Sequence, residues 1–216
     1  MSFSFLGLFL AFVIFLAIRY RMNNKKQQET EDSFWAREAT ANSVPTADLD
    51  SLQYITIPLD KFPLGFSKDP EITALETELQ ELADKRLLNL TGKTNTELKE
   101  AYGVANLATM QAIGEDFDRL TVILKEYAEG LIAQNQLTDA IRVLEFGVAI
   151  GTDISQNYTL LGDCYQALGQ TDKIGYLMTQ VENRHLLLGP SIIRHLHSLL
   201  SGDTDTEVNA PEDFSV

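Results

Sequence analysis

"LLGDCYQALGQ", residues 160–170, places the small residue Gly162 between the large residues Leu161 and Tyr165. Residues three and four apart share one face of an α-helix, so a second helix can approach closely at the glycine. Gly169 follows where a left-handed residue often ends a helix. The stretch predicts the first helix of an antiparallel helix pair. One such pair cannot bury its apolar face alone, so we expect neighbouring pairs.

The same pattern recurs 34 residues earlier in the chain. On the predicted first helices, Tyr158, Leu161, Gly162 and Tyr165 match Leu124, Tyr127, Ala128 and Leu131. On the predicted second helices, Met178 and Val181 match Leu144 and Gly147, and in the turns Gly169 matches Asn135. A period of 34 residues is typical of solenoids built from helix pairs. We therefore predict an all-α fold with two helix-pair repeats over residues 121–188.

The stretches "YAEGLIAQNQLTDAIRVLEFGVAIG" (residues 127–151) and "YTLLGDCYQALGQTDKI" (residues 158–174) resemble two consecutive tetratricopeptide repeats. The resemblance implies an α-solenoid whose repeat-packing residues are Tyr127, Ala128, Leu131, Ala140, Leu144, Leu161, Gly162 and Tyr165. Two departures are Ile174 at the family's small position and the missing closing prolines. With "LDSLQYITIPLDKFP" (residues 49–63), the whole chain also resembles bacterial membrane-anchored proteins of no established activity that end in such repeats.

Helices of other kinds are predicted on both sides of the repeats. Ile192, His195, Leu196 and Leu199 continue the first-helix pattern, which predicts a capping helix over residues 189–202. In the other direction Lys93 and Glu97 fall where packing residues are required. Residues 69–120 are therefore predicted to form helices that pack on the repeats differently.

Two helix starts are readable in the segment before the repeats. Asp69 followed by Pro70 predicts an N-cap with proline at the first helical position. Ile72, Leu75, Leu79 and Leu82 then form an apolar seam of about two heptads, which favours a helix packed on its own domain over a coiled coil. Thr94 and Glu97 have capping-box spacing, and Gly103 is the expected end of that helix.

An apolar run at the N-terminus, "FSFLGLFLAFVIFLAI" (residues 3–18), contains no charged residue. It predicts a transmembrane anchor over residues 1–20 that contacts the lipid bilayer through residues 3–20. Neither a preceding basic region nor a small-residue cleavage site is present, which favours a single-pass signal anchor over a cleaved signal peptide or a buried core helix. Basic residues follow at Arg19, Arg21, Lys25 and Lys26. They predict that the C-terminal body is cytoplasmic at the cell membrane.

Three further segments complete the predicted organisation. Residues 21–51 are first basic and then polar, as in a juxtamembrane linker or tether, and Phe34 and Trp35 in it are either interfacial anchors or a local contact with the body. Residues 52–68 contain Pro58 and Pro63, which predict an extended segment. Residues 203–216 are acidic without a core pattern, which predicts a disordered tail.

Charge and residue content argue against several functions. The chain has 216 residues and a formal net charge of -14. Such an acidic body repels phosphate backbones, so no nucleic-acid partner is expected. The spacing of the three histidines does not match a zinc site, and Cys164, the only cysteine, is expected to be a packing thiol. "GKT" at residues 92–94 lacks the rest of a phosphate loop. We predict no catalytic residue, metal or cofactor, and therefore no enzyme.

A protein-binding surface is the remaining expectation. By the family pattern, the groove-facing residues are Lys125, Glu129, Ile132, Thr159, Asp163 and Gln166, with plain solvated surface as the alternative. The acidic groove they imply would prefer a basic or neutral peptide. The leading hypothesis is a membrane-tethered scaffold for protein–protein interactions. The alternative is a structural, self-assembling membrane protein whose own segment, residues 52–66, fills the groove. The sequence indicates neither the partner nor the oligomeric state.

Overall fold

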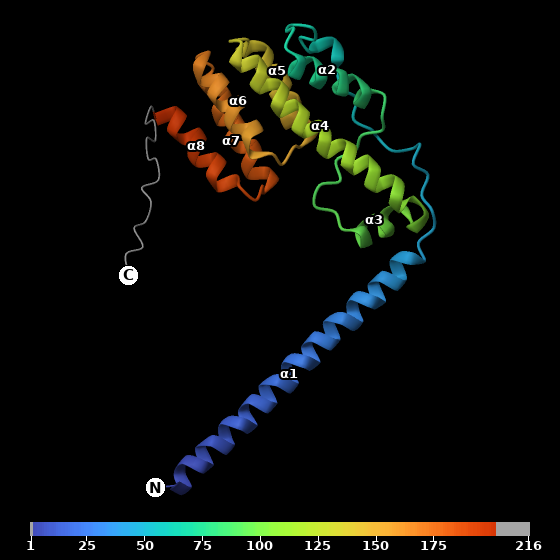
Figure 1. Cartoon of the computed structure of the whole chain (residues 1–216), viewed down its shortest axis with the longest axis vertical. Helices are drawn as coiled ribbons and strands as arrows, with labels where there is room; N and C mark the ends of the chain where they lie inside the picture. Colours follow the sequence, from blue (N-terminus) through green and yellow to red (C-terminus); the bar gives the residue numbers. More distant parts are fainter. Residues whose placement is uncertain (1, 202–216) are drawn as a thin grey trace. The chain divides into compact units, whose positions relative to one another are not determined.

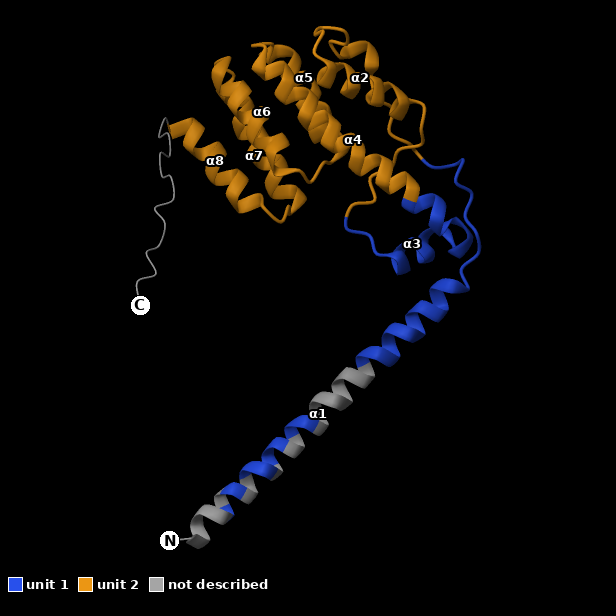
Figure 2. Ribbon diagram, in the orientation of Figure 1, with its two compact units in different colours: residues 1–52, 92–111 blue, residues 53–91, 112–216 orange. Residues whose placement is uncertain are grey.

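The computed structural model describes the backbone of residues 2–201 and the side chains of residues 30–201, together with eight earlier residues between Gly7 and Tyr20. Within this part of the chain every regular element is a helix, so the predicted all-α class is confirmed. The chain divides into two compact units (Figures 1 and 2). Unit 1 comprises residues 1–52 and 92–111, and unit 2 comprises residues 53–91 and 112–216.

Unit 1 pairs the end of a long helix with a short one. Helix α1 (Ser2–Asn42) packs against α3 (Asn95–Tyr102), which is followed by the 3-10 helix η2 (Val104–Asn106). Glu38 accepts hydrogen bonds from Lys99 and from Thr96, and Arg37 binds Glu100 through two nitrogens at 2.6 and 2.7 Å. The predicted capping box of α3 is confirmed.

The polar part of α1 differs from the expected tether. Residues 21–42 continue the helix as far as Asn42 instead of forming a flexible linker. The sequence explains the difference, because neither glycine nor proline occurs from residue 8 to residue 44 and many residues there favour helix. The chain leaves the helix just before Pro45. The linker is therefore a helical extension of the N-terminal segment over most of its length.

No helix of the described residues is long and apolar enough to cross a membrane. Of the predicted anchor, residues 3–6, 8, 10, 11, 14, 17 and 18 lie outside the residues whose side chains the structure describes. The anchor remains a prediction from the sequence.

Unit 2 begins with an extended segment that contributes to its core. After the 3-10 helix η1 (Leu59–Lys61), the chain runs to α2 (Pro70–Ala83), whose predicted N-cap, Asp69, accepts a hydrogen bond from the Glu71 amide. Ile57 and Phe62 are buried, and Phe62 packs edge-on against Phe146 with ring centroids 5.6 Å apart. The segment is therefore a structural part of unit 2.

Five helices follow: α4 (Leu107–Ala133), α5 (Leu137–Ile150), α6 (Ser155–Ala167), α7 (Thr171–Arg184) and α8 (Gly189–Ser201). The start of α4, up to residue 111, belongs to unit 1. The region after Gly103, for which the sequence predicts no definite element, is therefore helical almost throughout.

A 34-residue offset is visible in the backbone of unit 2. Helices α5 and α7 each have 14 residues, and α6 and α8 each have 13, and in both pairs every boundary is displaced by 34 positions. The turns agree, since Asn135 and Gly169 have φ angles of 59° and 69°. The left-handed turn residues predicted at these two positions are confirmed.

Small residues set the closest helix contacts of unit 2. A β-carbon on Gly162 would overlap Leu196 Cδ2 of α8, and one on Gly130 would overlap Ile72 Cδ1 of α2. Helix α8 therefore covers α6 at one end of the unit, and α2 covers α4 at the other. The predicted tail, residues 203–216, lies outside the described residues.

The eight predicted repeat-packing residues all lie on the inner faces of their helices. Tyr127, Ala128, Leu131, Ala140, Leu144, Leu161, Gly162 and Tyr165 are buried. All but Gly162 belong to one continuous apolar cluster that also includes α2 and the extended segment.

Candidate functional site

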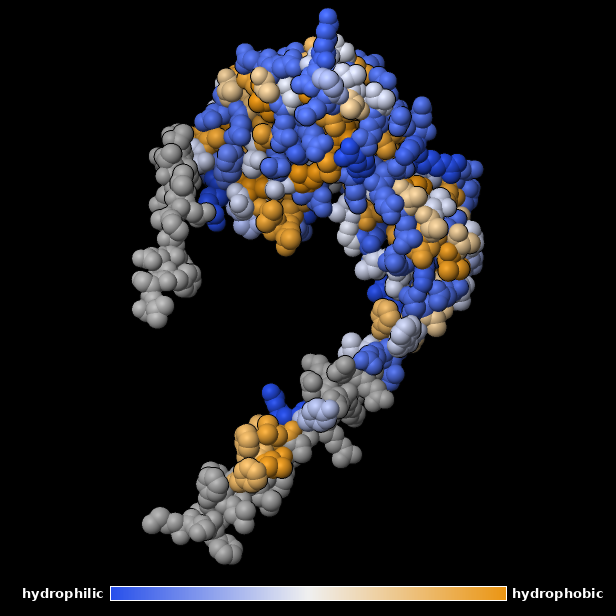
Figure 3. All heavy atoms as spheres, in the orientation of Figure 1, coloured by the Kyte–Doolittle hydropathy of each residue, from blue (hydrophilic) through white to orange (hydrophobic). Residues whose placement is uncertain are grey.

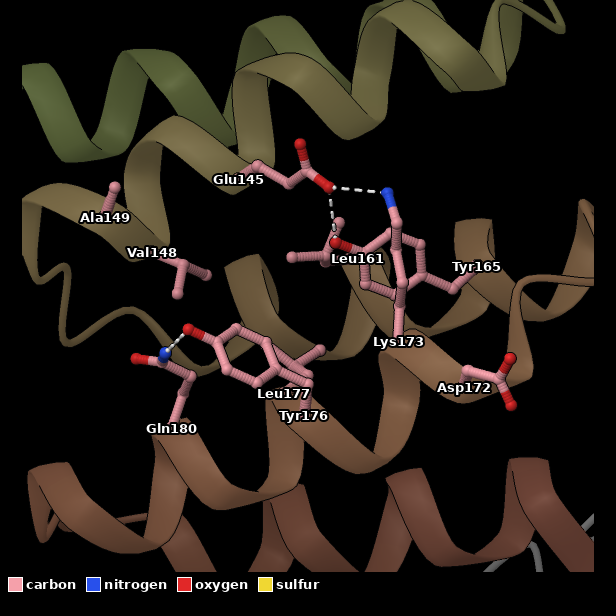
Figure 4. Close-up of a pocket in the computed structure, with 10 residues that line it drawn as sticks. All are labelled: Glu145, Val148, Ala149, Leu161, Tyr165, Asp172, Lys173, Tyr176, Leu177 and Gln180. Atoms are coloured by element: carbon pink, nitrogen blue, oxygen red, sulfur yellow. Dashed lines mark hydrogen bonds and ion pairs between the residues drawn. The ribbon is translucent and has the colours of Figure 1, made fainter.

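A groove opens on unit 2 where α5, α6 and α7 meet (Figure 4). It has a volume of about 450 Å³. Most of its lining is apolar, with Val148 and Ala149 from α5, Leu161 from α6 and Leu177 from α7. Tyr176 also lines it and is 69% exposed, with its hydroxyl accepting a 2.6 Å hydrogen bond from Gln180. We call this surface the outer groove.

A polar cluster stands at one side of the outer groove. The Tyr165 hydroxyl donates to Glu145 Oε1 at 2.7 Å, and Lys173 Nζ donates to the same oxygen at 3.1 Å. The Lys173 ammonium also lies over the Tyr165 ring, 5.0 Å from its centroid. These contacts join all three helices and hold the long Lys173 side chain in place at the rim.

The electrostatics of this cluster favour binding over chemistry. Burial first, and then the hydrogen bond to Glu145, raise the pKa of Tyr165 above its ordinary value. The hydroxyl therefore stays protonated at neutral pH and acts as a fixed donor. A phenol in this state is a poor general base, and its proton is already committed to Glu145. The cluster can orient side chains and present charge, but it holds no activated nucleophile.

A second hollow adjoins the outer groove across α5. Glu145 and Ala149 line both hollows, and the second continues over Phe146 and Arg142 to residues 58–62 of the extended segment. By the 34-residue offset, Arg142 and Phe146 are the counterparts of Tyr176 and Gln180. The exposed strip of α5 thus separates two related surfaces, of which the outer groove is the more apolar.

The six predicted groove residues lie elsewhere. On α4, Lys125 Nζ binds Glu129 Oε2 at 3.1 Å, and Ile132 is partly buried against the core. Glu129 lines a hollow between α2 and α4 together with Asp69 and Glu71. None of the six lines the outer groove.

The three predicted groove residues on α6 meet neighbouring backbone or α8. Asp163 Oδ1 lies 2.7 Å from His195 Nε2, and the Gln166 amide donates to the Leu199 carbonyl at 3.0 Å. The Thr159 hydroxyl donates to the Gln156 carbonyl at 3.3 Å. Two of the three are therefore engaged by the capping helix, and His195 is a carboxylate partner as well as a packing residue.

Sequence reasoning missed the outer groove because it followed the first helices of the repeats. The outer groove is built mainly from the second helices, α5 and α7. Tyr176 was the available signal, because it is a large aromatic residue beside the buried Leu177 and outside the repeat-packing pattern.

Other reactive groups in the described residues are accounted for by packing. Burial raises the pKa of Cys164 to about 11, so its thiol is protonated at neutral pH. Among residues with described side chains, no group of three or more histidine, cysteine or acidic residues could hold a metal ion.

No protein family, no curated protein and no solved structure matches this chain. The site must therefore be interpreted from its own geometry.

Proposed function

We propose that this protein is a membrane-tethered scaffold that binds another protein through the outer groove and catalyses no reaction. The observation that carries the proposal is the groove itself, an apolar hollow of about 450 Å³ beside the 69% exposed ring of Tyr176. Exposed apolar surface rimmed by polar residues is typical of protein-binding sites. Tyrosine is among the residues that contribute most to such interfaces.

The rim would add specificity to the apolar contact. Glu145, Asp172 and Lys173 place charges of both signs beside the apolar floor. Because Lys173 is held by Glu145 and Tyr165, a partner would meet it in a fixed position. A partner with an apolar side chain flanked by a basic group would fit the floor and the exposed Asp172.

The tether in this proposal rests on the sequence. Residues 3–18 are uncharged and are followed by four basic residues within eight positions, which is the pattern of an anchor with a cytoplasmic body. Tyr20 and Phe34 are 14 residues apart on α1, or about 21 Å along a helix axis. A helix standing along the membrane normal would therefore carry Phe34 and Trp35 beyond the headgroup layer, so we propose that they are not interfacial anchors.

The relation to tetratricopeptide repeats is part of the proposal. The 34-residue offset of two helix pairs and a final single helix supports it. The proposed binding surface, however, is formed by the second helices, whereas the family pattern points to the first.

Site-specific photo-crosslinking in intact cells tests the proposal. A photoreactive phenylalanine analogue replaces Tyr176 in the full chain, and in a matched control it replaces Glu182, which is exposed on the same helix outside the groove. We expect a protein adduct from position 176 that is absent from position 182. No adduct at position 176, or the same adduct from both positions, would overturn the proposal.

The extended segment supports a second candidate function. Ile57 and Phe62 are buried, and the Tyr127 hydroxyl lies 3.0 Å from both the Pro63 carbonyl and Glu76. Such a segment would serve self-assembly if it occupied the same site on a neighbouring copy. Deleting residues 52–66 separates the alternatives. Loss of cooperative unfolding indicates a structural segment, whereas retained folding with increased partner binding indicates that the segment covers a binding site.

A further inference from the structure

The turn between α7 and α8 presents two leucines to solvent. Leu187 is 96% exposed, the highest value among the exposed large apolar residues of the described chain, and Leu188 is 54% exposed. Apolar residues also reach the surface of unit 2 as separate patches among hydrophilic ones (Figure 3). A nearly fully exposed leucine in an ordered turn is unfavourable in water unless something covers it.

Backbone hydrogen bonds hold this turn rigid. The Gly189 amide donates to the Leu186 carbonyl at 2.9 Å, and the Leu188 carbonyl accepts from the amides of Ser191 and Ile192 at 3.0 Å. Leu186 packs against the core. The two exposed leucines are therefore preorganised for binding, which lowers the entropy cost of docking them.

The fold itself does not require leucine at position 187. The corresponding turn between α5 and α6, 34 residues earlier, has the exposed residue Asp153 at the equivalent position. An acidic residue thus satisfies the same turn in the same chain. Leu187 needs an explanation outside the stability of one copy.

The outer groove offers a matching surface on the same molecule. Its floor of Val148, Leu161 and Leu177 has room for aliphatic side chains, and the molecule's own Leu187 does not occupy it, since that side chain is exposed. We propose that the Leu187–Leu188 turn of one copy docks into the outer groove of a second copy. This inference rests on the proposed function and names the partner as the chain itself.

Charge favours the same pairing. Residues 184–194 around the turn contain Arg184, His185 and Arg194 and no acidic residue, although the chain as a whole has a net charge of -14. The groove carries the exposed Asp172 and the carboxylate of Glu145, with Lys173 already bound to Glu145. The least acidic surface loop of the repeats would therefore meet a groove with a free carboxylate at its rim.

The resulting association is head-to-tail. The turn and the groove are different surfaces, so each docked copy still offers one free turn or one free groove. Association of this kind extends into rows instead of closing as a twofold dimer. Copies held on one membrane would meet at a raised effective concentration.

Cysteine cross-linking of the full chain in membranes tests the docking. Two differently tagged copies are co-expressed, one with Leu187→Cys and the other with Tyr176→Cys, and treated with a short bismaleimide. We expect a product that contains both tags, and little product from either variant expressed alone. The unsubstituted chain is the control, because its Cys164 is buried. Absence of the mixed product, or a dominant Leu187→Cys homodimer, would overturn the inference.

A second measurement uses substitutions that the other repeat already tolerates. Leu187→Asp reproduces Asp153, and Tyr176→Arg reproduces Arg142 at the equivalent position. We expect each to reduce the concentration-dependent mass of the detergent-solubilised full chain to that of a monomer, with Glu182→Ala unchanged. If Leu187→Asp leaves the mass unchanged while Tyr176→Arg removes adducts with other proteins, self-docking is wrong and the proposed function stands. If the mixed product forms but no other protein is ever cross-linked at position 176, the groove serves self-association alone.

Discussion

Gly162 of α6 lies so close to Leu196 of α8 that a β-carbon at position 162 would overlap Leu196 Cδ2. This contact closes the last helix over the repeats. It also explains why the second repeat has glycine where the first has Ala128, because the capping helix brings a full leucine side chain to that position.

Gly162→Ala should therefore destabilise unit 2. Overpacking of a well-packed core costs about 1–3 kcal/mol, which exceeds the gain in helix propensity of roughly 1 kcal/mol. Gly175→Ala is the matched control, since it is a glycine in α7 whose β-carbon would meet nothing within 4 Å. Urea unfolding should show a lower midpoint for the first variant and a higher one for the second. Equal stabilisation by both would show that α6 and α8 are not in close contact.

Asn89 should be important for the end of α5. Its side-chain amide donates to the carbonyls of Ile150 and Gly151 at 3.0 and 2.9 Å. Asn89→Ala removes both bonds and should cost about 1–2 kcal/mol of unfolding free energy. Asn89→Asp should cost at least as much, because a carboxylate there faces the negative end of the helix dipole. Chemical denaturation checks this, with the exposed Asn183→Ala as a control expected to have little effect.

The packing of α1 on α3 should weaken in acid. Hydrogen bonds from Lys99 and then Thr96 lower the pKa of Glu38 below its usual 4.5, and the hydrogen bond from Arg37 lowers that of Glu100. A lowered folded-state pKa gives stability that is complete above the unfolded pKa and is lost as pH falls through the folded value. Lys99→Met should thus reduce the melting temperature at pH 7 but have a smaller effect below pH 4.5. A difference that does not change with pH would contradict the proposed ion pair.

Cys164 should resist thiol reagents in the folded chain. Burial raises its pKa from 9.0 to about 11, so little thiolate exists at pH 8. The same shift stabilises the fold below pH 9 and is lost as pH rises toward 11. Alkylation at pH 8 should be slow before and fast after addition of denaturant. Fast alkylation of the folded chain would show that α6 is more open than described.

The repeat architecture could be predicted because its signals are local. The 34-residue recurrence around Gly162 and the left-handed residues Asn135 and Gly169 are set by backbone and packing requirements within a few turns of helix. The capping box at Thr94 and the N-cap at Asp69 are equally local. Such features do not depend on distant parts of the chain.

The binding surface could not be predicted in the same way. The outer groove depends on how α5 and α7 lie across α6, which the sequence pattern does not specify. Asp163 and Gln166 have the correct spacing for a groove, but α8 lies on that face and binds both. The tether expected at residues 21–51 is helical because polar composition alone does not prevent a helix when glycine and proline are absent.

Proximity labelling of the intact protein in its own membrane tests the central claim most directly. The labelling enzyme is fused to the native chain, to Tyr176→Phe and to Tyr176→Arg, at equal expression. The proposal predicts that the native chain and the phenylalanine variant label the same specific proteins and that the arginine variant loses them. Identical labelling by all three would contradict a docking role for the outer groove.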